Sequence, residues 1–232
     1  MAAPLVEAAI EQIRQLIISG ELGPGERLPP EHQLSARLDV SRSSTREAVR
    51  ALATAKVLDI RRGDGTYVTS LRPQLLLEGI GFAVELMRDD SALELIELRR
   101  LLEPPATALA AERAKPDALQ EISASLVRMR KARGNEEFVH LDAEFHDLVN
   151  RASGNETLAS MLRGVSSRSM RARIWRDILE SGASERTMAE HERICAAVLA
   201  RDADAANAAA LLHVRSTEGW LRQVLQAGPA MD

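Results

Sequence analysis

The spacing of apolar residues changes character near residue 70. Before that point, short helical patterns are followed by two strand-like stretches, at 57–60 and 66–68. From residue 74 to residue 226, apolar side chains recur at helical spacing, with short polar breaks and without a convincing strand pattern. We therefore expect a mainly α protein in which a mixed N-terminal domain is followed by an all-α antiparallel helical bundle.

The end of the second strand pattern and a proline place the boundary between the two domains. The strand pattern ends near Ser70, and Leu71-Arg72-Pro73 then opens a new helical pattern. We predict an N-terminal domain over residues 1–70, a linker with the start of the first bundle helix over 71–78, and the helical bundle over 79–228. A chain of 232 residues suits two domains of modest size, each with its own core.

Six or seven helices are expected after the linker. Asn155 and Asp202 are suitable N-cap residues for two of them, and Pro104-Pro105 is expected to kink or break a third. The alternation of helices with short polar breaks is typical of an antiparallel bundle. The expected helices cover residues 74–88, 91–112, 117–131, 136–153, 155–180, 184–200 and 202–228.

The N-terminal domain carries the pattern of a helix-turn-helix. After a helix expected over residues 5–20, two further helical patterns are separated by the tight connection 38–41. Ser41 is placed to cap the second of them, because its hydroxyl can accept from the free amides of the turn that it opens. The two strand patterns then enclose the basic, glycine-containing turn 61–65, which predicts a hairpin. A helix-turn-helix followed by a basic hairpin is a winged helix.

The first turn after Ser41 has the chemistry of a nucleic-acid contact. It offers unpaired backbone amides, three hydroxyls and the guanidiniums of Arg42 and Arg46, which suit phosphates and base edges. The net charge of the chain is −4, but residues 37–62 hold seven basic and three acidic residues, a net charge of +4. The charge that DNA requires is thus concentrated in one segment. The alternative is an ordinary αα-hairpin with a solvated basic face.

Composition restricts the other classes of function. The chain has no apolar run near the roughly 20 residues of a membrane helix and no signal-peptide pattern at its start. We therefore expect a cytoplasmic protein with no membrane partner. The single cysteine, Cys195, excludes an intramolecular disulfide. A glycine-rich phosphate loop is absent, and no serine or cysteine nucleophile stands in a recognisable setting, so we do not expect an enzyme.

Histidines in the C-terminal part suggest a metal site. Asp142 and His146 are four residues apart and so project from one helix face, while His191 and His213 lie on two later helices. Together these side chains could bind a divalent transition metal such as Zn, Ni or Mn. From spacing alone, a solvated Asp–His pair and scattered histidines with local roles remain the simpler interpretation.

Four short motifs follow one another in the N-terminal domain: GERLP at 25–29, LSARL at 34–38, VSRSSTREA at 40–48 and GDGTYV at 63–68. Over about residues 5–70 this order resembles the winged helix of the GntR family of bacterial transcription factors, with His32 and Thr45 as departures. The resemblance implies DNA contacts from the recognition helix and from the wing. The implied contacts are Arg42, Ser43, Ser44 and Arg46 in the helix, and Arg62 and Gly63 in the wing.

The bundle carries its own ordered motifs: LIELRRLLEP at 95–104, DAEFH at 142–146, GN at 154–155 and EHERI at 190–194, followed by His213. Over residues 91–226 they resemble the effector-binding FCD domain of the FadR subfamily within the GntR family.

The FCD resemblance assigns roles to residues of these motifs. It implies that the metal is bound by Asp142, His146, His191 and His213. It also implies that Arg99 binds a carboxylate of the effector, for which the alternative is a surface ion pair with Glu103, four residues further on. Independently of the resemblance, four arginines cluster on the long helix, and one of them could also face the ligand, although a solvated face is the simpler interpretation: Arg168, Arg171, Arg173 and Arg176.

Together these features predict a homodimeric transcription factor, a repressor, that binds palindromic double-stranded operator DNA. A small organic acid or sugar acid, bound through the metal and Arg99, is expected to control its DNA affinity. The alternative function is a metal-sensing repressor in which the divalent ion is itself the signal. Arg99 discriminates between the two, because a pure metal sensor has no need of a buried guanidinium.

Overall fold

Two units make up the chain, and each folds around its own core. The computed structural model describes residues 2–87, 91–166 and 182–227. The contacts divide the chain between Leu76 and Leu77, inside the linker expected at 71–78. Among the described residues, no helix combines the length and the apolar character needed to cross a membrane.

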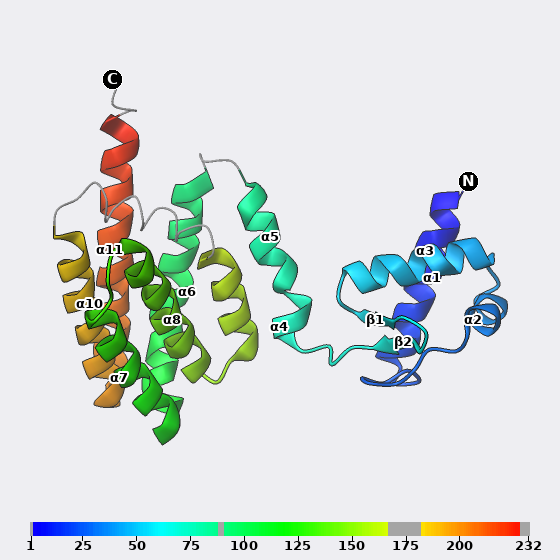
Figure 1. Ribbon diagram of the computed structural model, residues 1–232, viewed down its shortest axis with the longest axis horizontal. Helices are drawn as coiled ribbons and strands as arrows, with labels where there is room; N and C mark the ends of the chain where they lie inside the picture. The colour runs from blue at the N-terminus through cyan, green and yellow to red at the C-terminus, as the bar shows by residue number, and fades with distance from the viewer. Residues whose placement is uncertain (1, 88–90, 167–181, 228–232) are drawn as a thin grey trace. The chain divides into compact units, whose positions relative to one another are not determined.

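The first unit is a winged helix (Figure 1). Its elements are α1 (Ala2–Ile18), α2 (Glu31–Arg37), α3 (Arg42–Thr54), β1 (Leu58–Arg61), β2 (Gly65–Val68) and the short α4 (Pro73–Leu76). The two strands pair antiparallel, from Leu58 opposite Val68 to Arg61 opposite Gly65. The helix-turn-helix and the hairpin predicted from the sequence are therefore confirmed.

An apolar core holds the hairpin against the helices. Ile13 of α1, Leu34 of α2 and Leu52 of α3 are buried in it together with Leu58 and Val68 of the strands. The turn between α2 and α3 contains Asp39 at φ 51°, a left-handed conformation that aspartate tolerates better than most residues. This turn sets the angle between α2 and α3, and so fixes which side of α3 remains exposed.

The second unit is a helical bundle (Figure 1). It contains α5 (Glu78–Leu86), α6 (Ala92–Arg113), α7 (Pro116–Arg130), α8 (Asn135–Ala152), a helix that the structure describes over 156–166, α10 (Ala183–Leu199) and α11 (Ala203–Ala227). Helix α6 packs against α8, α10 and α11, and α7 packs against α8 and α10. The buried core between them includes Ile122, Phe145, Val149, Ile194 and Val198. The mainly α fold class predicted from the sequence is confirmed.

One expectation about the bundle helices was wrong, and one of two alternatives at the prolines is excluded. The helix expected over 74–88 is divided at Leu77 into α4 and α5, at the boundary between the two units, where Gly79 and Gly81 weaken helix propensity. Pro104 and Pro105, which were expected to kink or break a helix, lie inside α6. This helix continues through them to Arg113, so the break is excluded. Packing of α6 against three other helices outweighs the local cost of the prolines, about 3 kcal/mol each in a helix interior.

The expected caps are present. Leu158 N donates to Asn155 Oδ1 at 3.0 Å, and Ala205 N donates to Asp202 Oδ1 at 2.9 Å. Each cap satisfies one of the amides that a helix leaves unpaired in its first turn. The last of these helices, α11, carries His213 into the interior of the bundle.

Candidate DNA-binding surface and metal centre

The N-terminus of α3 is organised by Ser41. Its hydroxyl oxygen accepts from Ser44 N at 3.1 Å and lies 2.9 Å from Ser44 Oγ, while Thr45 Oγ1 donates to the Ser41 carbonyl at 3.1 Å. The sequence-predicted N-cap is thus confirmed. Thr45, one of the two departures from the family pattern, is fully buried.

The cap divides the predicted DNA contacts into two groups. Arg42, Ser43 and Arg46 are exposed on α3, as a surface that meets DNA requires. Ser44 differs, because its side chain is only 6% exposed and its hydroxyl pairs with that of Ser41. In this structure the Ser44 hydroxyl belongs to the cap, and a contact of Ser44 with DNA stays a prediction.

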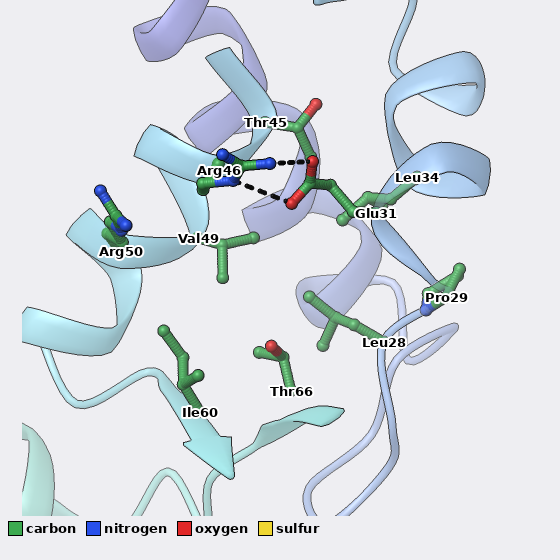
Figure 2. A pocket seen from close by; sticks show the side chains of 10 residues that line it. All are labelled: Leu28, Pro29, Glu31, Leu34, Thr45, Arg46, Val49, Arg50, Ile60 and Thr66. Carbon is green, nitrogen blue, oxygen red and sulfur yellow. Dashed lines mark hydrogen bonds and ion pairs between the residues drawn. The ribbon is translucent and has the colours of Figure 1, made fainter. Parts of the chain in front are cut away.

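Arg46 is paired with an acidic residue of α2 (Figure 2). Its Nη2 donates to Glu31 Oε1 at 2.7 Å and its Nε donates to Glu31 Oε2 at 3.1 Å. The hydrogen bond from Arg46 lowers the pKa of the exposed Glu31 carboxyl, and the same bond raises the pKa of Arg46. Sequence reasoning did not single out Glu31.

A cavity of about 280 Å³ opens beside this ion pair, between α2, α3 and the hairpin (Figure 2). Leu34, Val49 and Ile60 are among its apolar lining residues, and the Arg46–Glu31 pair and Arg50 are among its charged ones. The recognition helix and the wing therefore flank a shared concave surface with an apolar floor.

The two arginines of the wing differ in their contacts. Arg61 donates to Asp59 Oδ2 at 2.9 Å, and its guanidinium lies 4.3 Å from the centroid of the Tyr67 ring. Arg62 and Gly63 are exposed in the turn, where Gly63 adopts φ 78°, a left-handed conformation that favours glycine. Arg62 is thus the arginine that the turn leaves available for a phosphate or a groove.

The segment before α2 supports the wing turn from the side. Leu28 N donates to Thr66 O at 2.8 Å, and the Arg27 guanidinium donates to the carbonyl of Asp64. A Cβ at Gly65 would lie 2.4 Å from Arg27 Nε, so this glycine permits the close approach. The tip of the wing is therefore tied to the body of the domain.

Three histidines of the bundle converge in its interior. His146 of α8, His191 of α10 and His213 of α11 are all buried, and one ligand nitrogen from each lies within 4.8 Å of the others. The Nε2 atoms of His146 and His191 are 3.2 Å apart. Asp142 Oδ1 lies 3.3 Å from His191 Nε2 and 3.9 Å from His146 Nε2. All four residues singled out as metal ligands are thus brought together.

The geometry of these side chains fits a transition metal. Two ligands about 2.1 Å from a shared ion, at tetrahedral or octahedral angles, are about 3.0–3.4 Å apart, which matches the closest pairs in this cluster. His213 Nδ1 lies 2.8 Å from Glu190 Oε2. Its buried Nε2 makes no hydrogen bond to any part of the chain that the structure describes. A carboxylate on Nδ1 directs the Nε2 lone pair of a histidine toward a metal.

Ring packing fixes the orientation of His191. The Phe145 ring stacks on it with centroids 4.6 Å apart and an interplanar angle of 27°. Phe145 is itself fully buried in the core. The stacking on Phe145 therefore helps to orient the imidazole in the absence of an ion.

Arg99 lies in the same interior. It is fully buried on α6, and its guanidinium donates from Nε to Glu103 Oε1 at 2.5 Å and from Nη2 to Glu103 Oε2 at 3.2 Å. Burial alone lowers the pKa of Arg99, but the Glu103 carboxylate and then Asp142 outweigh it, so the pKa is raised. The pair with Glu103 is thus present, but it is buried, so the alternative of a surface ion pair is excluded.

Two carboxylates beside the histidines were not predicted: Glu190 was not singled out, and Glu103 was considered only as a surface partner of Arg99. Glu103 contacts Arg99, and its Oε2 lies 3.9 Å from His146 Nδ1. Glu190 contacts His213. Their position inside the motifs at 95–104 and 190–194 could have indicated a role at the site. An acidic residue in a helical pattern is usually exposed to solvent, however, so spacing gave no reason to select them. The arginines considered on the long helix, Arg168, Arg171, Arg173 and Arg176, lie outside the described residues.

A winged helix followed by a helical bundle with buried histidines has the architecture of a two-domain transcriptional regulator, and the comparisons with known proteins identify the family. The model of the FCD domain matches residues 94–216, and the model of the bacterial regulatory proteins of the gntR family matches residues 5–68. The chain belongs to the GntR family, with an FCD effector-binding domain. It is a DNA-binding transcriptional regulator, which confirms the expectation that it is not an enzyme.

Relatives of known name span nearly the whole chain. The HTH-type transcriptional regulator LutR of Bacillus subtilis (strain 168) is 33% identical over 212 residues, 89% of this chain and 96% of the relative. The galactonate operon transcriptional repressor of Escherichia coli (strain K12) is 28% identical over 214 residues, 90% of this chain and 93% of the relative. A solved structure, Streptococcus agalactiae GntR, is similar with a TM-score of 0.70 and 30% identity, covering 94% of this chain and all of that one (100%).

Proposed function

We propose that this regulator is a homodimeric repressor whose affinity for a palindromic operator is set by a small carboxylate. The carboxylate binds inside the bundle, at a divalent transition metal such as Zn, Ni or Mn and at Arg99. The observation that carries the proposal is the burial of Asp142 and three histidines in the same interior as the Arg99 guanidinium. A buried charged cluster of this kind is costly unless it serves a ligand.

The charges of the metal ligands explain why the effector would be an anion. Histidines bind a metal as neutral imidazoles, so a divalent ion held by them and Asp142 retains one positive charge. The ion would supply a Lewis-acidic contact for one oxygen of the acid, while Arg99 would bind a carboxylate through parallel N–H···O bonds. Without the ion, an entering acid would meet the negative charges of Asp142 and Glu103. Acid binding should therefore require the metal.

The acid is proposed to be a hydroxy acid or sugar acid. Such a molecule offers a hydroxyl beside its carboxylate, which suits a site with both a metal and a guanidinium. The name of one relative refers to a galactonate operon, and galactonate belongs to this chemical class. Galactonate and lactate, the latter a small 2-hydroxy acid, are accordingly the first probes to use.

On the DNA side, the exposed residues of the cap and the wing carry the contact. Arg42, Ser43 and Arg46 of α3 are proposed to enter the major groove, with Arg62 and Gly63 of the wing beside it. Ser44 acts through the cap that it shares with Ser41. Two winged helices in a homodimer would match a palindromic operator. The acid controls binding only if it favours one arrangement of the two DNA-binding domains over another.

The metal-sensing repressor is the alternative function. The specific observation in its favour is that Arg99 already has a carboxylate partner, Glu103, within the protein. In that function Arg99 and Glu103 would only support the metal ligands. Acid binding would then be absent, and the metal alone would change operator affinity.

One set of measurements separates these functions. Metal content is determined on the purified protein, and its melting temperature is measured with galactonate and lactate, with and without a chelator. The operator is first obtained by selection from random double-stranded DNA. The proposal expects one metal per chain, a melting shift by an acid that the chelator abolishes, and operator affinity that changes with the acid. Arg99→Ala should lose the acid shift and keep the metal. Operator affinity that follows the metal and ignores every acid would favour the metal sensor.

A further inference from the structure

Glu103 occupies the position on Arg99 that a carboxylate ligand would take. The two residues are one helical turn apart on α6, and their side chains are 0% and 3% exposed. The carboxylate meets the guanidinium side-on, with one oxygen near Nε and the other near Nη2. This is the bidentate geometry by which arginine recognises a free carboxylate.

A second carboxylate cannot simply be added on the side of the Arg99 guanidinium that Glu103 occupies. Among the described residues, Glu103 already balances the charge of Arg99, and the positive charge retained by the metal would lie at the histidines instead. A ligand carboxylate arriving on Arg99 would lie close to Glu103, and like charges at such distances in a buried site repel strongly. If Glu103 leaves as the ligand arrives, Arg99 exchanges one carboxylate for another and its charge remains balanced.

We propose that Glu103 is an internal occupant of the Arg99 carboxylate site and that the effector binds by displacing it. The inference rests on the proposed function, since it concerns how the acid reaches Arg99. Glu103 then acts as a positioning residue that sets the concentration at which the regulator responds. The apparent affinity for the acid is reduced by the fraction of protein in which Glu103 still covers Arg99.

A second partner for Glu103 lies close by. Its Oε2 is 3.9 Å from Nδ1 of His146, the nitrogen opposite the Nε2 that faces His191 and Asp142. A histidine that binds a metal through Nε2 carries its proton on Nδ1 and donates it to a carboxylate or carbonyl. A shift of about 1 Å would bring the displaced Glu103 into hydrogen-bond range of this donor. Displacement therefore need not leave a buried charge unpaired.

The displacement of Glu103 also predicts which ligands the site accepts. A ligand must replace the bidentate contacts of Glu103 on Arg99 and also bind the metal, because contact with Arg99 alone gives no net gain over the internal pair. A hydroxy acid provides both groups. A sugar without a carboxylate cannot replace Glu103 and should leave Glu103 paired with Arg99.

The test compares Glu103→Gln with the wild type, both loaded with Zn²⁺, by calorimetric titration with galactonate and lactate. The variant keeps the side-chain shape and removes the competing charge. We expect the acid that binds the wild type to bind Glu103→Gln at least about tenfold more tightly. Glu97→Gln is the matched control, because Glu97 lies on the same helix and forms an exposed ion pair with Arg100. It should bind the acid as the wild type does.

The outcomes separate this inference from the proposed function. Equal or weaker acid binding by Glu103→Gln would overturn the displacement and leave the acid sensor intact. Zinc binding without acid binding in both proteins would overturn the proposed function, and the displacement with it. If Glu103→Gln does not fold, the crystal structure of the zinc-loaded wild type with the acid decides. Glu103 still paired side-on with Arg99 in that complex would contradict the exchange.

Discussion

Glu31 and Arg46 are joined across the helix-turn-helix by two parallel hydrogen bonds, of 2.7 and 3.1 Å. The pair links α2 to α3 on the exposed side of the domain (Figure 2). On the surface that we propose to contact DNA, an acidic residue alone would repel the phosphates. Its two hydrogen bonds instead fix the plane of the Arg46 guanidinium and leave other N–H groups of Arg46 unused by this pair.

Replacing Arg46 with alanine should weaken operator binding. The loss of one arginine contact to a base or phosphate is expected to cost about 1–3 kcal/mol, because the DNA partner is left without its donor. Fluorescence anisotropy with the selected operator measures the change. Arg14→Ala is the control, since Arg14 is an exposed arginine on α1 that pairs with Glu11. If Arg46→Ala and Arg14→Ala bind the operator with equal affinity, Arg46 does not contact DNA.

The same pair predicts a pH dependence. The hydrogen bond from Arg46 lowers the pKa of Glu31 in the folded protein. The pair therefore stabilises the fold above the ordinary pKa of a glutamate, and this contribution is lost as the pH falls through the lowered pKa. In Arg46→Ala the pKa of Glu31 should rise. An NMR titration of the glutamate side chains measures it, and an unchanged Glu31 pKa would contradict the pairing in solution.

Substitutions of Ser41 and of Ser43 should distinguish a loss of stability from a loss of DNA affinity. Ser41→Ala removes the cap that accepts from Ser44 N, and should destabilise the winged helix by about 1 kcal/mol. Ser43 is exposed and is proposed to contact DNA. Ser43→Ala should keep the melting temperature and lower operator affinity. Chemical denaturation and anisotropy measure the two effects, and a stability loss in Ser43→Ala with none in Ser41→Ala would reverse the assignment.

Removing two of the histidines should abolish metal binding. His146→Ala together with His191→Ala leaves one imidazole and Asp142, too few ligands for a tightly held ion. Elemental analysis of purified protein should then find no stoichiometric metal. His140→Ala is the control, because His140 lies on the same helix, α8, with an exposed side chain. Full metal content in the double variant would show that the ligand set is wrong.

Glu190 should increase the affinity for the metal although it does not bind the ion. Glu190 Oε2 lies 2.8 Å from His213 Nδ1, so Glu190→Gln should weaken metal affinity about 10–100-fold, as loss of a carboxylate behind a ligand histidine does. Competition with a chromogenic chelator measures the affinity. Glu192→Gln provides the comparison, because Glu192 is an exposed residue on the same helix that pairs with Arg130. Similar losses in both variants would indicate a general effect of charge.

Local patterns were sufficient for the elements and caps of this protein. The Ser41 cap, the turn at Asp39 and the hairpin around Gly63 depend on residues within a few positions of one another, so the sequence alone determined the winged helix. Helical spacing likewise determined the bundle helices over most of their length. It failed at Leu77, where the boundary between the two units interrupts the helix. At Pro104-Pro105 it left a kink and a break open, and the packing of α6 decided against the break.

The candidate site was decided by tertiary structure. Spacing placed Asp142 and His146 on one face, but His191 and His213 join them only because α8, α10 and α11 pack in one particular register. The burial of Arg99, and the roles of Glu103 and Glu190 beside the histidines, depend on the same packing. A pattern of apolar residues specifies which face of a helix is buried, but not its axial position or rotation against a neighbour. Those two quantities determine which polar side chains meet in the interior.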